Sequence, residues 1–334
     1  MDIKKKYENN ISTLISIGYP KADILSIEGT TGEKEYFEVC EFYQSNLEYN
    51  YKNYAIDPSI WFMRPSFNIN ARAIKSPKYF LIGTNNGVID FLFTNFKNNP
   101  SLFDKIKSVE KYKDLEDKLD NPFHTLMYQA NLNFTFYHEM GHLVQFSKRG
   151  IKSAKISELA SKSSVFNLQD HVDEIDADTF SCLYASGHVY QYIINYVSTN
   201  PDEQEMVILI STITTAISLY LLSFPSYNVD YYEKEGTHPH VMIRVLNVIN
   251  VVIDSFIKLL KNKGHIMAAT KEQITKETLI LIKELSPKMS SSIDLSIMVQ
   301  AVVKNGKQME SYLNLLSTSA YGDRNSAWSQ RNKL

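Results

Sequence analysis

The amino-acid sequence predicts an α+β protein that is predominantly helical, with a small antiparallel sheet near its N-terminus. Residues 59–93 read as extended chain and contain a hairpin turn signal. From about Pro100 nearly to the end, apolar residues recur at helical spacing, and the breaks fall at Gly, Asn and Pro. No linker-like segment interrupts the chain, so we expect a single domain over residues 1–334.

Length and composition are those of an ordinary globular protein. The 334 residues are 44% hydrophobic and 22% charged, and 35 basic against 37 acidic residues leave a net charge of −2. Because the chain has no long basic run, its charge pattern argues against a nucleic-acid partner. The two cysteines, Cys40 and Cys182, lie far apart, which excludes a disulfide framework and a cysteine-rich metal cluster and favours the cytoplasm.

The N-terminal elements are expected in the following order. Residues 1–58 form a helical region, in which 33–49 predicts a helix with Phe37, Cys40 and Phe42 on or near one face. The sheet of residues 59–93 follows. Its hairpin is expected to pair 79–82 with 88–93 across an Asn-Gly turn.

Residues 206–224 form the one candidate for a membrane span. They contain no charge in 19 residues, and as a helix they would be about 28 Å long, close to the ~30 Å thickness of the bilayer hydrocarbon. Six of them are Ser or Thr, and the flanks lack the Lys/Arg excess that orients a span. We expect a buried core helix, with a span as the alternative. The N-terminus lacks the uninterrupted apolar stretch of a secretory signal.

An HExxH motif at residues 138–142 is the strongest chemical signal. On a helix, His138 and His142 lie one turn apart on the same face, so both can direct a ring nitrogen at one tetrahedral cation. Glu139 follows the first of these ligands and can act as general base on a metal-activated water. The alternative is a helix whose two histidines fall at this spacing by accident.

A catalytic zinc site needs a third protein ligand and an open fourth position. A second predicted helix carries Asp170, Glu174 and Asp178 along one stripe. Glu174 is the expected third ligand, and Asp178 could accept the spare N–H of a ligand histidine. Asp178 and His171 are rival ligands, and without the HExxH motif the acidic run would be read as a solvated helix face.

A third motif, residues 237–244, begins another helix. Pro239 suits the first turn, and the residues that follow predict an amphipathic helix. Its predicted polar stripe comprises Arg244, Asn247, Asp254, Lys258 and Lys261. His238 or His240 could donate a hydrogen bond to the oxyanion of a hydrolytic reaction, and Arg244 could pair with the acidic helix or hold substrate. Two tyrosines compete for the oxyanion role: Tyr231 and Tyr232. A capped helix with an incidental histidine is the alternative.

Together, HEMGH at 138–142, EIDAD at 174–178 and THPHVMIR at 237–244 resemble the signature of the gluzincin metallopeptidases of the HtpX and CAAX-prenyl-protease type. The pair Asn70-Ala71 is similar to the Asn-Ala that precedes the edge strand in that family. The resemblance implies a zincin-like fold with its catalytic core at 122–245 and helices over 246–334. It also implies zinc bound by the two histidines and Glu174, Glu139 as base, and hydrolysis of peptide bonds.

This chain departs from the family in its number of candidate membrane spans. Its members usually carry several spans, whereas a single crossing at 206–224 would separate Glu174 from His238. We therefore expect a cytoplasmic endopeptidase that cleaves an intracellular protein, like soluble peptidases of the phage-exclusion Lit type. Its substrate would add as a strand to the edge of the 59–93 sheet. The alternatives are a membrane-anchored HtpX-like protease and a non-catalytic zinc-stabilised binding module, whose site a fourth ligand, His171 or His238, would close.

Overall fold

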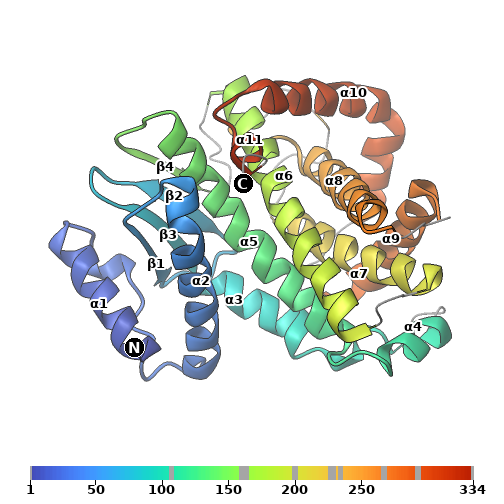
Figure 1. The fold of residues 1–334 in the computed structure, drawn as a ribbon, viewed down its shortest axis with the longest axis horizontal. Helices are drawn as coiled ribbons and strands as arrows, with labels where there is room; N and C mark the ends of the chain where they lie inside the picture. Colours follow the sequence, from blue (N-terminus) through green and yellow to red (C-terminus); the bar gives the residue numbers. More distant parts are fainter. Residues whose placement is uncertain are drawn as a thin grey trace. The chain divides into compact units, whose positions relative to one another are not determined.

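The structure is a computed structural model, and its contacts divide the chain into two compact units (Figure 1). It describes residues 2–104, 109–157, 165–197, 202–224, 231, 236–264, 269–289 and 295–331. The first unit comprises 1–91, 138–160 and 321–334, and the second comprises 92–137 and 161–320.

The first unit begins with two helices, α1 (Ile3–Ser16) and α2 (Glu33–Tyr54). The predicted helix at 33–49 is therefore confirmed and continues one turn further. Its expected inner face is present, because Phe37 and Cys40 are buried and Phe42 is half-buried. The helix ends where Ala55 adopts a left-handed conformation with φ of 54°.

A mixed sheet of four strands forms the centre of this unit. The strands are β1 (Ser59–Arg64), β2 (Ala71–Lys75), β3 (Phe80–Asn85) and β4 (Ala154–Ser157). Their order is β1-β3-β2-β4, with β1 parallel to β3 and the other pairs antiparallel. The small sheet is thus confirmed, but it is not purely antiparallel, and its fourth strand comes from beyond residue 93.

The predicted hairpin across the Asn-Gly pair is wrong. Residues 83–85 complete β3, and 88–92 belong to a helix, α3 (Asn86–Leu92). Asn86 is the first residue of this helix, and its side-chain oxygen accepts a hydrogen bond of 2.7 Å from the Ser66 N–H. A Cβ on Gly87 would lie 2.2 Å from the Phe67 carbonyl oxygen. The glycine therefore permits a close backbone approach, which sequence alone does not distinguish from a turn.

The outer edge of β1 is covered by groups from the preceding chain. The Trp61 N–H donates to Gln44 and the Trp61 carbonyl accepts from Asn10. On Met63, the N–H donates to the Tyr7 hydroxyl, and the carbonyl accepts from the Leu25 N–H at 2.8 Å. Strands β2 and β3 lie inside the sheet, so the strands within 59–93 offer no open edge to a peptide, contrary to expectation.

The second unit is helical throughout its described regular structure. Its main helices are α4 (Val109–Glu116), α6 (Leu168–Tyr192), α7 (Glu203–Leu222), α8 (Val241–Asn262), α9 (Lys271–Leu285) and most of α10 (Leu295–Gly322). Short turns occupy Phe93–Lys97, Pro100–Leu102, Ile193–Val197 and Ser286–Lys288. The long helix α5 (Phe123–Lys148) belongs to this unit up to Tyr137 and to the first unit from His138. The short C-terminal helix α11 (Ala327–Arg331) lies in the first unit.

Helix α7 contains the uncharged segment 206–224. Among the described residues it is the one helix long and apolar enough to span a membrane, and 89% of its most apolar window is buried. Asp202 and Glu205 form a capping box at its N-terminus. On its α9 side, the hydroxyls of Ser211 and Thr215 donate to the carbonyls of Ile274 and Thr278, each at 3.3 Å. Five of the six Ser and Thr hydroxyls of this segment thus donate hydrogen bonds in a packed interior, and the exception is the buried Thr212.

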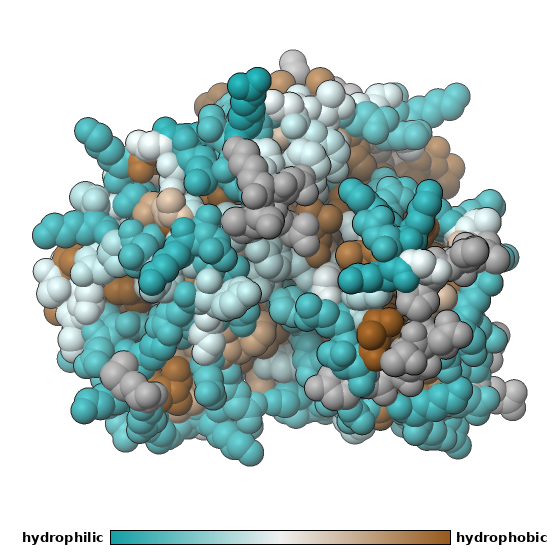
Figure 2. Space-filling model, viewed as in Figure 1, coloured by the Kyte–Doolittle hydropathy of each residue, from teal (hydrophilic) through white to brown (hydrophobic). Residues whose placement is uncertain are grey.

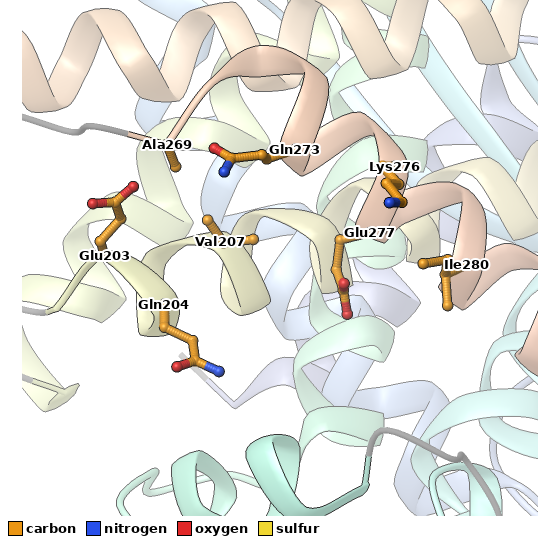
Figure 3. Close-up of a pocket in the computed structure, with 8 residues that line it drawn as sticks. All are labelled: Glu203, Gln204, Val207, Ala269, Gln273, Lys276, Glu277 and Ile280. Carbon is orange, nitrogen blue, oxygen red and sulfur yellow. The ribbon is translucent and has the colours of Figure 1, made fainter.

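Polar side chains cover most of the surface that faces the viewer in Figure 2, with apolar ones scattered among them. A hollow of about 520 Å³ lies between α7 and α9 (Figure 3). Its polar and charged lining residues are Glu203, Gln204, Gln273, Lys276 and Glu277. The lining contains no histidine or cysteine, so this hollow lacks the soft donors of a transition-metal site.

We predict that Gly87→Ala lowers the free energy of unfolding by about 2–4 kcal/mol, because the new methyl group would meet the Phe67 backbone and displace it. Urea unfolding followed by circular dichroism measures this. Gly187→Ala is the matched control, since its Cβ would meet nothing within 4 Å and it lies inside α6. That variant should be neutral or up to about 1 kcal/mol more stable. Equal behaviour of both variants would contradict the close approach at Gly87.

Candidate metal centre

The two histidines of the HExxH motif direct their Nε2 atoms at each other from one turn of α5. These atoms lie 3.2 Å apart, the ring planes are nearly perpendicular at 88°, and both side chains are buried. Two nitrogens bound tetrahedrally to zinc at 2.0–2.1 Å would be about 3.3–3.4 Å apart. The observed separation therefore fits a shared cation, as the i, i+4 spacing predicts.

Gln145 fixes the orientation of the second histidine. The Nδ1–H of His142 donates to the Gln145 Oε1 at 2.9 Å, and the amide is itself buried. With Nδ1 occupied in this way, the lone pair is on Nε2, the atom that faces His138. Our reading of the sequence missed Gln145. Its position three residues after His142, on the same helix face, is the signal that could have identified it.

Glu174 is the acidic residue that joins the histidines. One ligand atom each of His138, His142 and Glu174 lies within 4.8 Å of the others, and all three side chains are buried. Such a group could bind a metal ion. The rival ligands Asp178 and His171 do not belong to this group in the described part of the chain, and the His171 Nδ1 instead meets the Tyr312 hydroxyl at 2.9 Å.

Two side chains from the 237–244 motif lie beside the Glu174 carboxylate. The His238 Nε2 lies 3.3 Å from Oε1, and the Arg244 Nη2 lies 3.8 Å from Oε2. The other ring nitrogen of His238 is 2.8 Å from the Thr237 hydroxyl. The third motif thus meets the acidic helix at the predicted ligand, and His238 contacts that ligand directly.

Arg244 forms a buried, two-pronged ion pair with Asp178. Its Nε and Nη2 donate to the two carboxylate oxygens at 2.8 and 2.7 Å, and both side chains are at most 5% exposed. Arg244 therefore pairs with the acidic helix, one of its two expected roles. Asp178, expected to support a ligand histidine, receives these hydrogen bonds from Arg244. Asn247 is also buried and donates to Thr179, so the first part of the predicted polar stripe on α8 faces α6.

The acidic run on α6 is not a solvated face. Asp173, Glu174, Asp176 and Asp178 are all buried, with Asp176 and Asp178 at most 1% exposed. Asp170 at the helix start is half-buried, and its pKa is raised by burial and by the nearby charges of Asp173 and Glu174. Burying this many carboxylates is unfavourable unless cations compensate them. Arg244 supplies one positive charge, and a metal ion would supply two more.

The other proposed oxyanion donors are His240, Tyr231 and Tyr232. His240 caps the N-terminus of α8 by accepting the Met242 N–H on Nδ1 at 3.2 Å. Tyr231 packs edge-on against His240, with ring centroids 5.8 Å apart. Tyr232 lies outside the described residues. Among these candidates, His238 is the one whose described contacts reach a predicted metal ligand.

Glu139 is the expected general base of the HExxH motif. Its side chain is 1% exposed, and it directly follows His138 on α5. The possible metal ligands are the imidazole nitrogens of His138 and His142 and the carboxylate of Glu174, a combination typical of catalytic zinc. Comparisons of this chain with protein-family models, with curated proteins and with solved structures give no match.

We predict that Gln145→Leu lowers affinity for zinc about 10- to 100-fold, because His142 loses the hydrogen bond that orients its ring. Competition against a chromogenic chelator measures this affinity. Gln129→Leu is the control, since Gln129 is exposed on the same helix and should leave the affinity unchanged. The same affinity in Gln145→Leu and the control would show that this amide does not support the ligand.

We predict a strong coupling between Arg244 and Asp178. Arg244→Met alone should destabilise the protein by about 3–5 kcal/mol, because it leaves a buried carboxylate without its cation. Adding Asp178→Asn should recover part of that loss. A double-mutant cycle by urea unfolding measures the coupling, and strictly additive effects would contradict it.

Proposed function

We propose that the protein is a zinc-dependent endopeptidase with a zincin-like catalytic core, as its gluzincin-type motifs imply. The observation that carries the proposal is the buried group of His138, His142 and Glu174, with Glu139 beside it on the metal-binding helix. The enzyme would act on an intracellular protein. The order and combination of the three motifs support the same assignment.

The chain's own residues have distinct roles in this proposal. His138, His142 and Glu174 would hold zinc, which acts as a Lewis acid on the scissile carbonyl and makes water more acidic. Glu139 takes a proton from the attacking water as oxygen bonds to the carbonyl carbon. It then delivers that proton to the amide nitrogen as the C–N bond breaks, which yields a carboxylate and an amine. Burial strengthens every charge interaction in these steps.

His238 is proposed first as a positioning residue. Its Nε2 lies 3.3 Å from Glu174, so its N–H can fix the ligand carboxylate while Thr237 engages the other nitrogen. Donation to the oxyanion stays a prediction, and it requires the same N–H to turn toward substrate.

An extended peptide is the substrate geometry that the sheet favours. Because side chains and a preceding segment cover the outer edge of β1, the edge that no described residue pairs with is that of β4. Strand β4 pairs with β2 through Ala154–Ser157, and its outward backbone groups can pair with a peptide. We therefore move the proposed docking edge from the 59–93 strands to β4.

A closed, non-catalytic zinc site is the second candidate. The observation that favours it is the distance of 3.3 Å between the His238 Nε2 and Glu174. His238 does not belong to the described group of possible ligands, so it would have to move toward the histidines to serve as a fourth ligand. In that case zinc would stabilise a binding module and Glu139 would have no chemical role.

We predict that Glu139→Gln abolishes cleavage while zinc is retained, with a loss of at least about 100-fold in kcat. The measurement compares new protein N-termini in cells that express the wild type or the variant, after metal analysis of both purified proteins. Glu174→Gln is the control that should lose zinc as well as activity. Cleavages unique to the wild type would support the peptidase. Identical N-termini in both cell lines, with zinc bound, would favour the closed site.

A further inference from the structure

Two arginines lie on the same face of the sheet in the first unit. Arg72 on β2 pairs with Gly83 on β3, which in turn pairs with Phe62 on β1. Paired residues of neighbouring strands point to the same face, and so do residues two apart on one strand. Arg64, two residues after Phe62, therefore shares the face of Arg72. Lys155 shares it too, because it lies two residues before Ser157, the β4 partner of Arg72.

Gly83 lets the Arg64 side chain extend over β3 in the direction of Arg72. A Cβ at Gly83 would lie 3.0 Å from the Arg64 Cδ and 2.8 Å from the Phe62 Cζ. The stem of Arg64 thus lies directly over Gly83, the residue that is paired with Arg72. A side chain at position 83 would displace the Arg64 stem and the Phe62 ring.

These cations are only partly compensated by the protein. Arg64 is 9% exposed, its Nη1 donates to Asn85 at 3.0 Å, and its Nη2 lies 3.9 Å from Asp23, a side chain that is 49% exposed. Tyr19, which packs on Phe62, also contacts the Arg64 guanidinium. Among the described residues, the buried Nε atoms of Arg64 and Arg72 have no hydrogen-bond acceptor. A guanidinium buried in this way is stabilised by an anion.

Arg72 and the proposed general base belong to the same compact unit. Burial and the Arg64 charge lower the pKa of Arg72, whereas the Glu139 carboxylate is one of the groups that raise it. Arg72 is in register with Ser157 at the end of β4, so it lies next to the strand on which a peptide is proposed to add.

We propose that Arg64 and Arg72 bind a carboxylate of the substrate close to the scissile bond, so that the enzyme prefers acidic substrates. This inference rests on the proposed peptidase function. The planar guanidinium fork matches a carboxylate with two parallel hydrogen bonds. The carboxylate belongs either to an Asp or Glu side chain or to the C-terminus of the peptide, and both sources present the same chemistry.

A peptide library made from a cellular proteome provides the test, with purified zinc-loaded wild type and Arg72→Gln. In the wild type we expect an acidic group at one fixed position relative to the cleaved bond. Arg72→Gln should lower kcat/KM for a cleaved acidic peptide about 10- to 100-fold and leave its Asp→Asn or Glu→Gln counterpart nearly unchanged. Lys152→Gln is the matched control, since it removes an exposed charge from the same unit.

Amidation of the library separates the two sources. Preference for an internal Asp or Glu survives amidation, whereas preference for the C-terminal carboxylate is lost. Arg72→Lys should recover only part of the rate, because a lysine cannot form two parallel hydrogen bonds. Cleavage without acidic preference, or an equal loss on acidic and neutral peptides in Arg72→Gln, would overturn the inference and leave the peptidase standing. No cleavage of any peptide by the wild type would instead count against the peptidase itself.

Discussion

The burial of an acidic helix is the constraint on which the candidate site depends. Helix α6 buries Asp173, Glu174, Asp176 and Asp178, and ionised carboxylates are stable in such surroundings only beside cations. Arg244 supplies a two-pronged partner for Asp178, and the same guanidinium lies 3.8 Å from Glu174. Helix α8 therefore lies along α6. The residues that precede α8 bring His238 to the Glu174 carboxylate. One ion pair thus fixes both the helix packing and the geometry of a ligand.

The same low-polarity surroundings suit the proposed chemistry. The two histidines that could bind a metal ion are at most 1% exposed, and Gln145 orients one of the rings, so little rearrangement would be needed to bind a cation. Glu139 is equally buried, so its charge interacts strongly with a neighbouring metal or substrate. Such groups are unfavourable for folding when they stand alone. Several such groups lie on α5 and α6. We interpret the resulting loss of stability as a requirement of the proposed function.

In the first unit, the sheet serves a different purpose. One edge is covered by α1, α2 and the segment that joins them, which protects it from pairing with other chains. The other edge, β4, remains free in the described chain, and Arg72 lies on the strand next to it. Gly83 and Gly87 each allow a close approach that a side chain would prevent, one under Arg64 and one at the start of α3. Small residues therefore determine where the charged groups of this sheet can lie.

The sequence by itself determined the parts of the protein that follow local periodicity. The i, i+4 spacing of His138 and His142, the stripe that presents Glu174 and the mostly helical architecture all follow from the 3.6-residue turn. Tertiary structure decided what depends on distant partners: the parallel pairing of β1 with β3, the helix where Asn86-Gly87 predicted a hairpin, and the pairing of Asp178 with Arg244. Neither Gln145 as a histidine partner nor the arginine pair was foreseen. Local patterns restrict which face a side chain occupies, whereas contacts between segments far apart in the chain decide what that side chain meets.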